Sequence, residues 1–291
     1  FNENIFMNIL SHFKYWKVTA LDTGSFWLDG GAMMGSVPKV LWEKENFPDE
    51  LNRIKLSMRC LLLDDGKNIV LIETGIGNKF NNKFKDMFSI EQSTFPISDS
   101  LNQAGYTVEN ITHVILTHLH FDHAGGATIF NNNELIPTFP NAEYFISKKN
   151  WEAAINPNPK DRASYLSENF ISLKEKSALH LIDDNVNILD GISTYIVNGH
   201  TYGQQLVKIN DGDESLIFCS DLIPLKSQLR IPWIMGYDLN ASLTLKEKTT
   251  FLNFAADRKW WLFFYHDPNY VAVQIKKADT KYYDINQEIL A

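Results

Sequence analysis

Three histidines and an aspartate fall within six consecutive positions, 118–123, of the segment "THLHFDHAGG". His118 and His120 are two residues apart, so an extended segment points both imidazoles to the same side. Asp122 and His123 follow at once and can reach a second point across a tight loop. Neutral imidazole and carboxylate are ligands of first-row divalent metals. The segment therefore predicts metal binding by one loop that can reach two ions, against the alternative of a polar loop whose histidines cap a helix.

Six residues cannot complete two coordination spheres, so further ligands are expected downstream. His200 in "VNGHTYG", Asp221 in "FCSDLIP" and His266 in "FFYHDP" each follow a short apolar run, as His118 does. Taken singly, each is equally compatible with a capped turn or a buried core residue. Their shared place at the ends of expected strands favours a common site, since two ions about 3.5–4 Å apart can hold a bridging hydroxide at neutral pH.

Short strands are the elements expected to position these residues. The segment "RIKLSMRCLLLDDGKNIVLIETGIG" predicts strands over 54–63 and 68–73, joined by a turn at Asp65 and Gly66. The run "ITHVILT" predicts a buried strand that ends at His118. Further strands are predicted in "AEYFIS", "STYIVNG", "QLVKI", "LIFCS" and "WWLFFY".

Helices are expected between these strands. "SDSLNQAG" predicts a short helix with Ser98 or Asp99 as its cap and Gly105 at its end. "SKKNWEAAIN" predicts a helix capped by Ser147, and residues 161–177 are expected to be mostly helical.

In "TLKEKTTFLNFAADRK", Thr244 and Glu247 have the spacing of a capping box at a helix start. Strands and helices alternate along the chain, which predicts an α/β fold with two β-rich layers covered by helices and a site along one edge. No linker-like composition divides the chain, so residues 1–291 are expected to form a single domain.

Composition narrows the class of partner. The net charge of −8 and pI near 5.5 disfavour binding to nucleic acid or a membrane surface, and favour a small-molecule partner. No apolar run reaches the length of a membrane helix, and "FNENIFMNILSHFKYW" lacks a signal peptide's apolar core. Cys60 and Cys219 are expected to be buried thiols, although a single disulfide between them stays open. The expected location is cytoplasmic, with a leader removed before Phe1 left open.

The motifs "THLHFDHAGG", "GHT", "SD" and "YHDP", in this order, resemble the metal-binding motifs of the metallo-β-lactamase superfamily, whose fold is an αββα sandwich. The resemblance implies two divalent metal ions, with zinc first and Mn, Fe or Co admissible. It implies one ion held by His118, His120 and His200, a second held by Asp122, His123 and His266, and Asp221 as the bridge. No cysteine stands at a ligand position, which disfavours penicillin hydrolysis as the main activity.

Three positions depart from the family pattern. The family's "DTG" is "ETG" here, so Glu73 stands where an aspartate supports a ligand. Gln204 stands where many relatives have a further histidine. Pro224 occupies the position of a tyrosine found in many homoserine-lactone hydrolases, so any phenol acting on the substrate would come from Tyr202 or Tyr237, or the metal would act alone.

Two apolar segments are expected to contact a substrate. "FWLDGGAMMGSVPKVLW" resembles the "LDGGAMFG" segment near the active-site mouth of N-acyl homoserine lactonase-like members, and it supplies Met33 and Met34. "RIPWIMGYD" supplies Trp233, Met235 and Tyr237, and the two segments together could enclose an acyl chain. Core packing is the alternative for both, and a homodimer contact is a further alternative for the first.

The expected reaction is hydrolysis of a lactone or carboxylic ester, N-acyl homoserine lactones included, by a hydroxide bound to both metals. Asp221 would bridge the metals and Asp122 would relay a proton to the leaving group. The alternatives are a glyoxalase II-like thioesterase, a mononuclear iron sulfur dioxygenase, and a non-catalytic ligand sensor that keeps its metals for structure.

Overall fold

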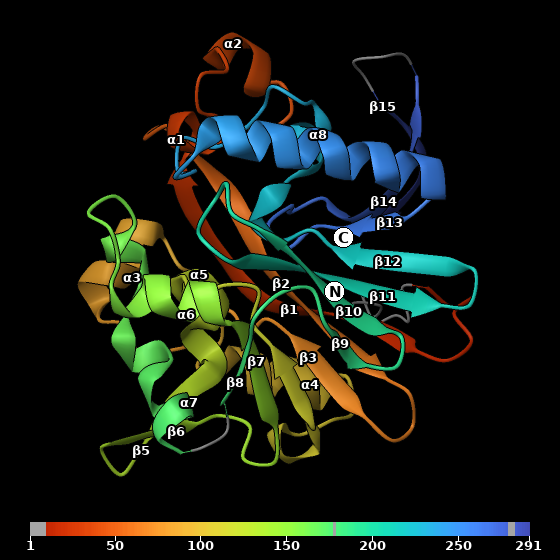
Figure 1. Ribbon diagram of the computed structural model, residues 1–291. Coiled ribbons are helices and arrows are strands. Elements are labelled where there is room, and N and C mark those ends of the chain that lie inside the picture. Colours follow the sequence, from red (N-terminus) through yellow and green to blue (C-terminus); the bar gives the residue numbers. More distant parts are fainter. Residues whose placement is uncertain (1–9, 177–178, 279–282) are drawn as a thin grey trace. The chain divides into compact units, whose positions relative to one another are not determined.

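The computed structural model describes residues 10–176, 179–278 and 283–291 (Figure 1). The chain divides into two compact units, hereafter unit 1 (Phe1–Gly24 and Met58–Val186) and unit 2 (Ser25–Ser57 and Asn187–Ala291). Strands β1 (Lys17–Asp29) and β2 (Arg53–Asp64) contribute residues to both units. The single-domain organisation stays a prediction, and most of the N-terminal segment inspected for a signal peptide lies outside the described residues.

The sheet of unit 1 has the strand order β1-β2-β3-β4-β7-β8. The later strands are β3 (Ile69–Ile72), β4 (His113–Ile115), β7 (Glu143–Ser147) and β8 (Leu179–Ile182). β2 and β3 pair antiparallel, which confirms the predicted hairpin, and Gly66 in its turn has φ +86°. β3, β4, β7 and β8 run parallel, so their carboxyl ends share one edge, and the segment with His118 leaves β4 at that edge.

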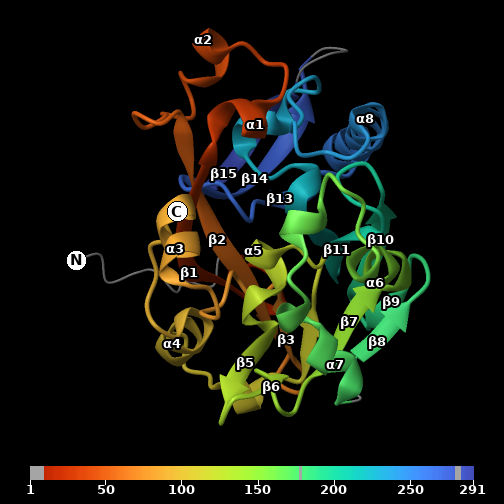
Figure 2. The same ribbon diagram turned by 90° about the vertical axis from the view of Figure 1, so that its left-hand side faces the viewer.

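Helices and short strands connect the strands of this sheet (Figure 2). They are α3 (Asn82–Phe88), α4 (Pro96–Gln103), η1 (Val108–Asn110), α5 (Phe121–Ala124), η2 (Gly125–Ala127), β5 (Thr128–Asn131), β6 (Glu134–Pro137), α6 (Lys148–Ile155), η3 (Arg162–Ser164), η4 (Ser167–Asn169) and α7 (Ile171–Glu175). Ser147 caps α6 as predicted, accepting a hydrogen bond from the Asn150 amide. The described part of 161–177 is mostly helical, as predicted, in three short elements, η3, η4 and α7, the last of which ends at Glu175; Ser177 lies outside the described residues.

The predicted cap of α4 was wrong. The helix begins at Pro96, so Ser98 and Asp99 lie inside its first turns. Proline is favoured at the first position of a helix, since its fixed φ suits that position and it has no N–H to leave unpaired. The predicted end is confirmed, because Gly105 has φ +88°.

The sheet of unit 2 has the strand order β15-β14-β13-β12-β11-β10-β9. These strands are β9 (Asn187–Leu189), β10 (Ile192–Val197), β11 (Gln204–Asp211), β12 (Glu214–Phe218), β13 (Trp261–Phe263), β14 (Tyr270–Lys277) and β15 (Tyr283–Leu290). The remaining helices of this unit are α1 (Gly30–Met34), α2 (Lys39–Trp42), η5 (Ser220–Leu222), η6 (Lys226–Leu229) and α8 (Ala241–Arg258). Helix α8 packs on this sheet (Figure 1), and its Phe251 and Leu252 belong to the same buried cluster as Leu206 and Ile217.

The capping box predicted at Thr244 and Glu247 was wrong, because α8 starts a turn earlier. Asn240 is the cap, and its side chain accepts a hydrogen bond from the Leu243 amide. The Thr244 hydroxyl donates to the Asn240 carbonyl, and Glu247 is used in a contact with another segment described below. Spacing alone does not distinguish these roles from a cap.

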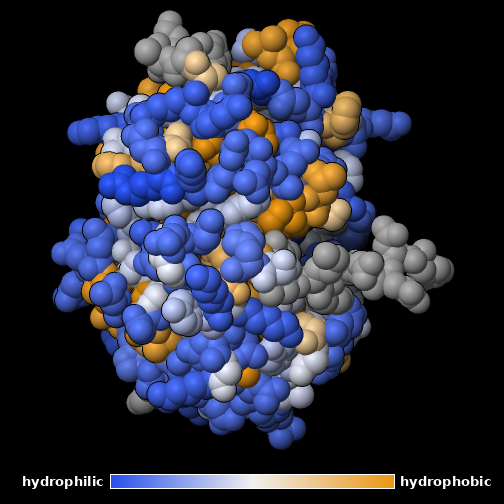
Figure 3. Space-filling model, turned by 90° about the vertical axis from the view of Figure 1, so that its right-hand side faces the viewer, coloured by the Kyte–Doolittle hydropathy of each residue, from blue (hydrophilic) through white to orange (hydrophobic). Residues whose placement is uncertain are grey.

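The two cysteines are buried and free in the structure, as predicted. Burial raises the pKa of both thiols above the ordinary range. On the face drawn in Figure 3, hydrophobic residues form separate groups among hydrophilic ones. Among the described helices, none combines the length and the apolar character that crossing a membrane requires.

Candidate metal centre

The histidine-rich loop of unit 1 is fixed by its backbone. It leaves β4, and the Leu119 amide donates to the Asn150 side chain at 2.9 Å. His120 precedes α5, and its carbonyl accepts from the amides of His123 and Ala124. The His123 carbonyl in turn accepts from both the amide and the hydroxyl of Thr74, at 3.0 and 2.8 Å. Hydrogen bonds of the backbone thus hold the loop that carries the four ligand candidates.

Glycines let the loop approach the "ETGIG" segment closely. A Cβ on Gly125 would lie 2.1 Å from the Ile76 carbonyl oxygen, and a Cβ on Gly126 would lie 2.1 Å from that of Thr74. No side chain fits at such separations, which explains the glycine pair that follows His123. The half-buried Lys79 ammonium donates to the carbonyls of Gly125 and Thr128, and burial lowers its pKa to about 8.

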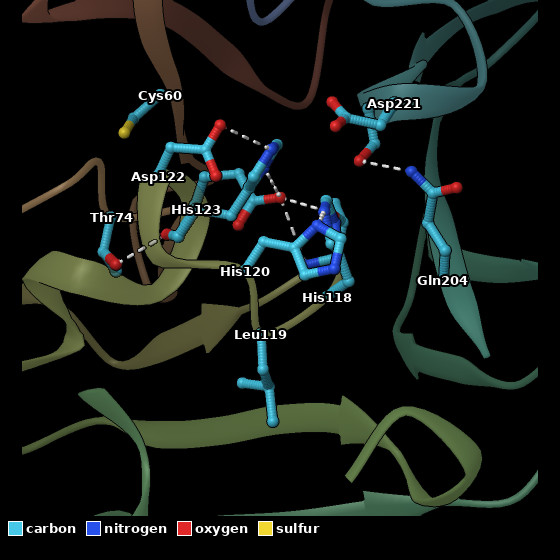
Figure 4. A network of polar contacts seen from close by, with 12 residues as sticks. Cys60, Thr74, His118, Leu119, His120, Asp122, His123, Gln204 and Asp221 are labelled. Carbon is cyan, nitrogen blue, oxygen red and sulfur yellow. Dashed lines mark hydrogen bonds and ion pairs between the residues drawn. The ribbon is translucent and has the colours of Figure 1, made fainter. Parts of the chain in front are cut away.

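The ligand candidates of unit 1 gather at this loop (Figure 4). His118 Nε2 lies 3.1 Å from His120 Nδ1, and His123 Nε2 lies 3.7 Å from an oxygen of Asp122. Two nitrogens that share a tetrahedral zinc ion at about 2.0–2.1 Å are about 3.3 Å apart. Glu73, His118 and His123 also place one ligand atom each within 4.8 Å of the others. The donor set therefore fits a divalent cation.

The Glu73 carboxylate contacts two residues of the histidine-rich segment, Thr117 and His123. One of its oxygens accepts from the Thr117 amide and hydroxyl and lies 3.1 Å from His123 Nδ1. A proton on Nδ1 leaves Nε2 of His123 free to bind a cation. Burial raises the pKa of the Glu73 carboxyl, and the His123 ring opposes that rise. Glu73 has φ +65°, a left-handed conformation that few residues other than glycine adopt.

The ligand candidates of unit 2 are arranged around one carboxylate. One oxygen of Asp221 lies 3.2 Å from His200 Nε2, and the other lies 3.3 Å from His266 Nε2. Both separations match the spacing of two ligands on one ion. Each oxygen of this carboxylate is therefore paired with a different imidazole.

Both imidazoles of unit 2 are oriented through their other nitrogen. His200 Nδ1 lies 3.0 Å from a carboxylate oxygen of Asp238, and His266 Nδ1 lies 2.9 Å from the Ser57 carbonyl. The Ser57 carbonyl can only accept, so His266 donates from Nδ1 and presents the lone pair of Nε2. The Asp238 carboxylate has the corresponding place beside His200 Nδ1.

The loops that carry His200 and Asp221 are fixed by polar contacts within unit 2. The Glu247 carboxylate accepts from the amides of Asn198 and Gly199 at 2.8 and 2.9 Å, and its burial raises its pKa. Ser220, directly before Asp221, has φ +46°. Its hydroxyl accepts from the Gln204 amide at 2.9 Å (Figure 4). Gln204 therefore has a structural role at the position where many relatives have histidine.

The structure brings together the two segments expected to contact a substrate. The Gly236 amide donates to the Ala32 carbonyl at 2.8 Å, and the Gln228 amide donates to that of Met33 at 2.9 Å. The exposed fractions of the candidate substrate contacts are Met33 2%, Met34 0%, Trp233 8%, Met235 4% and Tyr237 38%. Burial of the first four favours core packing, and their contact with a substrate stays a prediction.

A buried lysine lies beneath the second segment. Lys248 on α8 is 0% exposed, and its ammonium donates to the carbonyls of Arg230 and Trp233 at 2.9 and 2.6 Å. Burial lowers its pKa to about 7, opposed by the charge of Asp238. Lys248 thus holds the turn before Trp233 and places a cation near the partner of His200.

Sequence reasoning missed several supporting residues. They are Thr74, Lys79, Thr117 and Asn150 in unit 1, and Ser57, Asp238, Glu247 and Lys248 in unit 2. Asp238 ends the quoted run "RIPWIMGYD", but nothing in its spacing from His200 marks it as a partner. For the α8 residues, the sequence offers one indication of a special role: a lysine or glutamate on the side of an expected amphipathic helix that should be buried.

A family model described as the metallo-beta-lactamase superfamily matches residues 58–266. An N-acyl homoserine lactonase from Bacillus cereus is 27% identical over 176 residues, which cover 57% of this chain and 63% of the lactonase. The match thus spans less than two thirds of that relative.

Two solved structures are similar over nearly their whole length. One, described as a probable metal-dependent hydrolase from Staphylococcus aureus, has a TM-score of 0.88 at 27% identity and covers 96% of this chain and 98% of its own. The other, the dizinc quorum-quenching lactonase AidC, has a TM-score of 0.79 at 22% identity over 95% of this chain and 96% of its own.

These matches, together with the ligand geometry of each unit, place the chain in the metallo-β-lactamase superfamily. The predicted family and its α/β fold are confirmed.

Proposed function

We propose that this protein is a metal-dependent hydrolase that opens a lactone or a carboxylic ester. The observation that carries the proposal is the Asp221 carboxylate, whose two oxygens face two different imidazoles. This pairing supports the proposal that Asp221, together with His200 and His266, would help to hold two cations. The lactonases among the relatives and solved structures support N-acyl homoserine lactones as the first substrate to test.

The proposed ligands are those implied by the family pattern: His118, His120, Asp122, His123, His200, Asp221 and His266. Zinc is the first metal to test, because imidazole and carboxylate suit it and a relative in the same fold carries two zinc ions. Divalent cations at such a site supply Lewis-acid activation of water and of a carbonyl oxygen.

The chain's own residues then have distinct tasks. Asp238, Ser57 and Glu73 accept from Nδ1 of three histidines and so fix which nitrogen binds a cation. Asp122 is the proposed proton carrier to the leaving group, since its carboxylate belongs to the loop that carries the ligands. No tyrosine stands at position 224, and Tyr202 and Tyr237, 53% and 38% exposed, stay candidates for contact with the substrate carbonyl.

Elemental analysis and turnover test the proposal together. We expect two metal ions per chain and hydrolysis of N-hexanoyl homoserine lactone or an aryl ester that chelation abolishes and Zn²⁺ restores. His118→Ala should lose metal and activity, whereas His180→Ala, a change of the same type at a half-exposed histidine, should keep both. Full activity in a folded His118→Ala protein would contradict the proposal.

Other outcomes would select the alternatives. Faster turnover of an acyl-glutathione than of any lactone or oxygen ester would indicate a thioesterase. One iron per chain with oxidation of glutathione persulfide would indicate a sulfur dioxygenase. Tight binding of a product-like ligand without turnover of any of these substrates would indicate a sensor.

We also propose a cytoplasmic location and a homodimer. Four apolar side chains of residues 40–51 are at least 47% exposed, namely Val40, Leu41, Phe47 and Leu51, and such a group favours a protein contact. Sedimentation of the wild type beside Phe47→Asp tests the dimer, since a monomer in both would contradict it.

A further inference from the structure

A cavity of about 130 Å³ in unit 2 is lined in part by the carboxyl-terminal half of α8, the long helix that lies over this sheet in Figure 1. It is lined by Ser193, Thr194 and Tyr195 of β10, Leu206 and Lys208 of β11, Ile217 of β12, Phe251 and Phe254 of α8, and Trp260. None of these is a proposed metal ligand, so the cavity is a feature separate from the proposed catalytic residues. Apolar cavities of about 150 Å³ accommodate benzene. The volume therefore suits a small ring or a short alkyl chain.

The floor of the cavity is one face of the sheet, with a lysine in its middle. Lys208 pairs with Ser193 on one side and with Ile217 on the other, and Leu206, two residues away, shares its face. Leu206 and Ile217 are 0% and 2% exposed and belong to the core of unit 2. A half-buried ammonium beside these apolar side chains is costly unless an anion accompanies it.

A second cation lies close to the first. Lys208 Nζ is 4.7 Å from the centroid of the Trp260 ring, and Arg258 Cζ is 5.6 Å from the same centroid. Burial and the nearby Arg258 charge both lower the pKa of Lys208. Among the residues that the structure describes, neither cation forms an ion pair with a carboxylate; Lys208 lies over the Trp260 ring, and Arg258 lies near the rings of Phe254 and Trp260. The rim thus carries two positive charges beside an apolar cavity.

We propose that this cavity binds a small organic carboxylate with an apolar body of about the size of benzene. The body fills the space between Leu206, Ile217 and Phe251, and the carboxylate lies at the rim with Lys208 and Arg258. A guanidinium can hold both oxygens of a carboxylate, and an ammonium can add a third hydrogen bond. Phe254 and Tyr195, 44% and 45% exposed, leave the rim accessible from solvent.

Titration of the metal-loaded protein with 4-fluorobenzoate, followed by ¹⁹F NMR, tests the proposal. We expect saturable binding that Lys208→Gln and Arg258→Gln each weaken at least about tenfold, since the first removes one charge-assisted hydrogen bond and the second removes the bidentate pair. Lys246→Gln makes the same change of charge at an exposed position of the same helix and should leave the affinity unchanged. Neutral fluorobenzene should bind at least about tenfold more weakly than the carboxylate.

A third variant provides an independent test of the binding site. Ser193→Leu narrows the cavity without changing charge and should also weaken binding, so a folding defect in one variant does not decide the outcome. Absence of saturable binding would overturn the proposal. So would binding that chelation abolishes but Lys208→Gln and Arg258→Gln leave intact, because the benzoate would then lie at the metals. Equal affinity for fluorobenzene would also overturn it, since the cations would have no role.

Discussion

The two units present their proposed ligands in opposite ways. Unit 1 carries four of them on one stretch, 118–123, whose backbone is fixed by Thr74, Asn150 and the packing of two glycines. Unit 2 carries His200, Asp221 and His266 on three separate loops: His200 contacts Asp238, His266 contacts the Ser57 carbonyl, and the loop of Asp221 is held through the contact of Ser220 with Gln204. A contiguous set is fixed by one loop conformation, whereas a dispersed set needs a separate contact for each residue.

The units share one device despite this difference. Each contains a lysine whose ammonium donates to two backbone carbonyls, Lys79 in unit 1 and Lys248 in unit 2. Burial lowers the pKa of both, to about 8 and about 7 respectively. Such a lysine satisfies two backbone carbonyls with hydrogen bonds. The cost is the desolvation of its charged ammonium.

The largest expected effect tests the central place of Asp221. Asp221→Asn removes charge from a carboxylate that serves two imidazoles, so both metals should be lost and activity should fall on the order of a thousandfold. Metal content and kcat/KM measure this, with the exposed Asp183→Asn as the control. Retention of one tightly bound metal together with most of the activity would show that the carboxylate does not bridge.

The next prediction compares the partners of the two histidine sets. Asp238→Asn and Glu73→Gln should each lower metal affinity about 10–100-fold, because each weakens the hydrogen bond that fixes a ligand imidazole. Competition with a chromophoric chelator measures both variants. If the ligands of 118–123 are held mainly by their backbone, Glu73→Gln should lower metal affinity less than Asp238→Asn does. A larger loss in Glu73→Gln would contradict the proposed difference between the two units.

A pH experiment examines Lys248. Its pKa is about 7 in the folded protein against a usual 10.5, so between these values the unfolded chain binds more protons. The free energy of unfolding therefore gains from this group as pH rises. From pH 7 to 8.5 the wild type should gain up to about 2 kcal/mol relative to Lys248→Met. Urea denaturation measures this, and the exposed Lys246→Met should show the wild-type dependence.

The smallest expected effect concerns the contact that replaces the predicted capping box. Glu247→Gln weakens two hydrogen bonds to the segment before His200 and should cost about 1 kcal/mol of unfolding free energy. Thr249→Val, a neighbouring change on α8, removes one hydroxyl contact within the helix and serves as the control. An effect of Glu247→Gln no larger than that of the control would mean that α8 contributes little to the position of this loop.

Local patterns predicted the elements well where a residue's role is local. The turn at Gly66, the Ser147 cap and the end at Gly105 were all read correctly, because each depends on a few neighbouring residues. Glu247 was misread because a carboxylate at cap spacing can equally bind another segment. The contiguous ligands could be read from spacing, whereas Asp238 as the partner of His200 depends on a tertiary fold that spacing does not encode.

Two residues with positive φ also bear on how this protein would respond to selection for heat resistance. Glu73 and Ser220 each cost about 1 kcal/mol relative to a residue that accepts this conformation, so glycine or asparagine would be favoured at both positions in a screen for stability alone. Glycine cannot accept the hydrogen bonds that these side chains receive next to the proposed ligands. Laboratory evolution for heat resistance would therefore favour substitutions at these two positions that raise stability and lower activity.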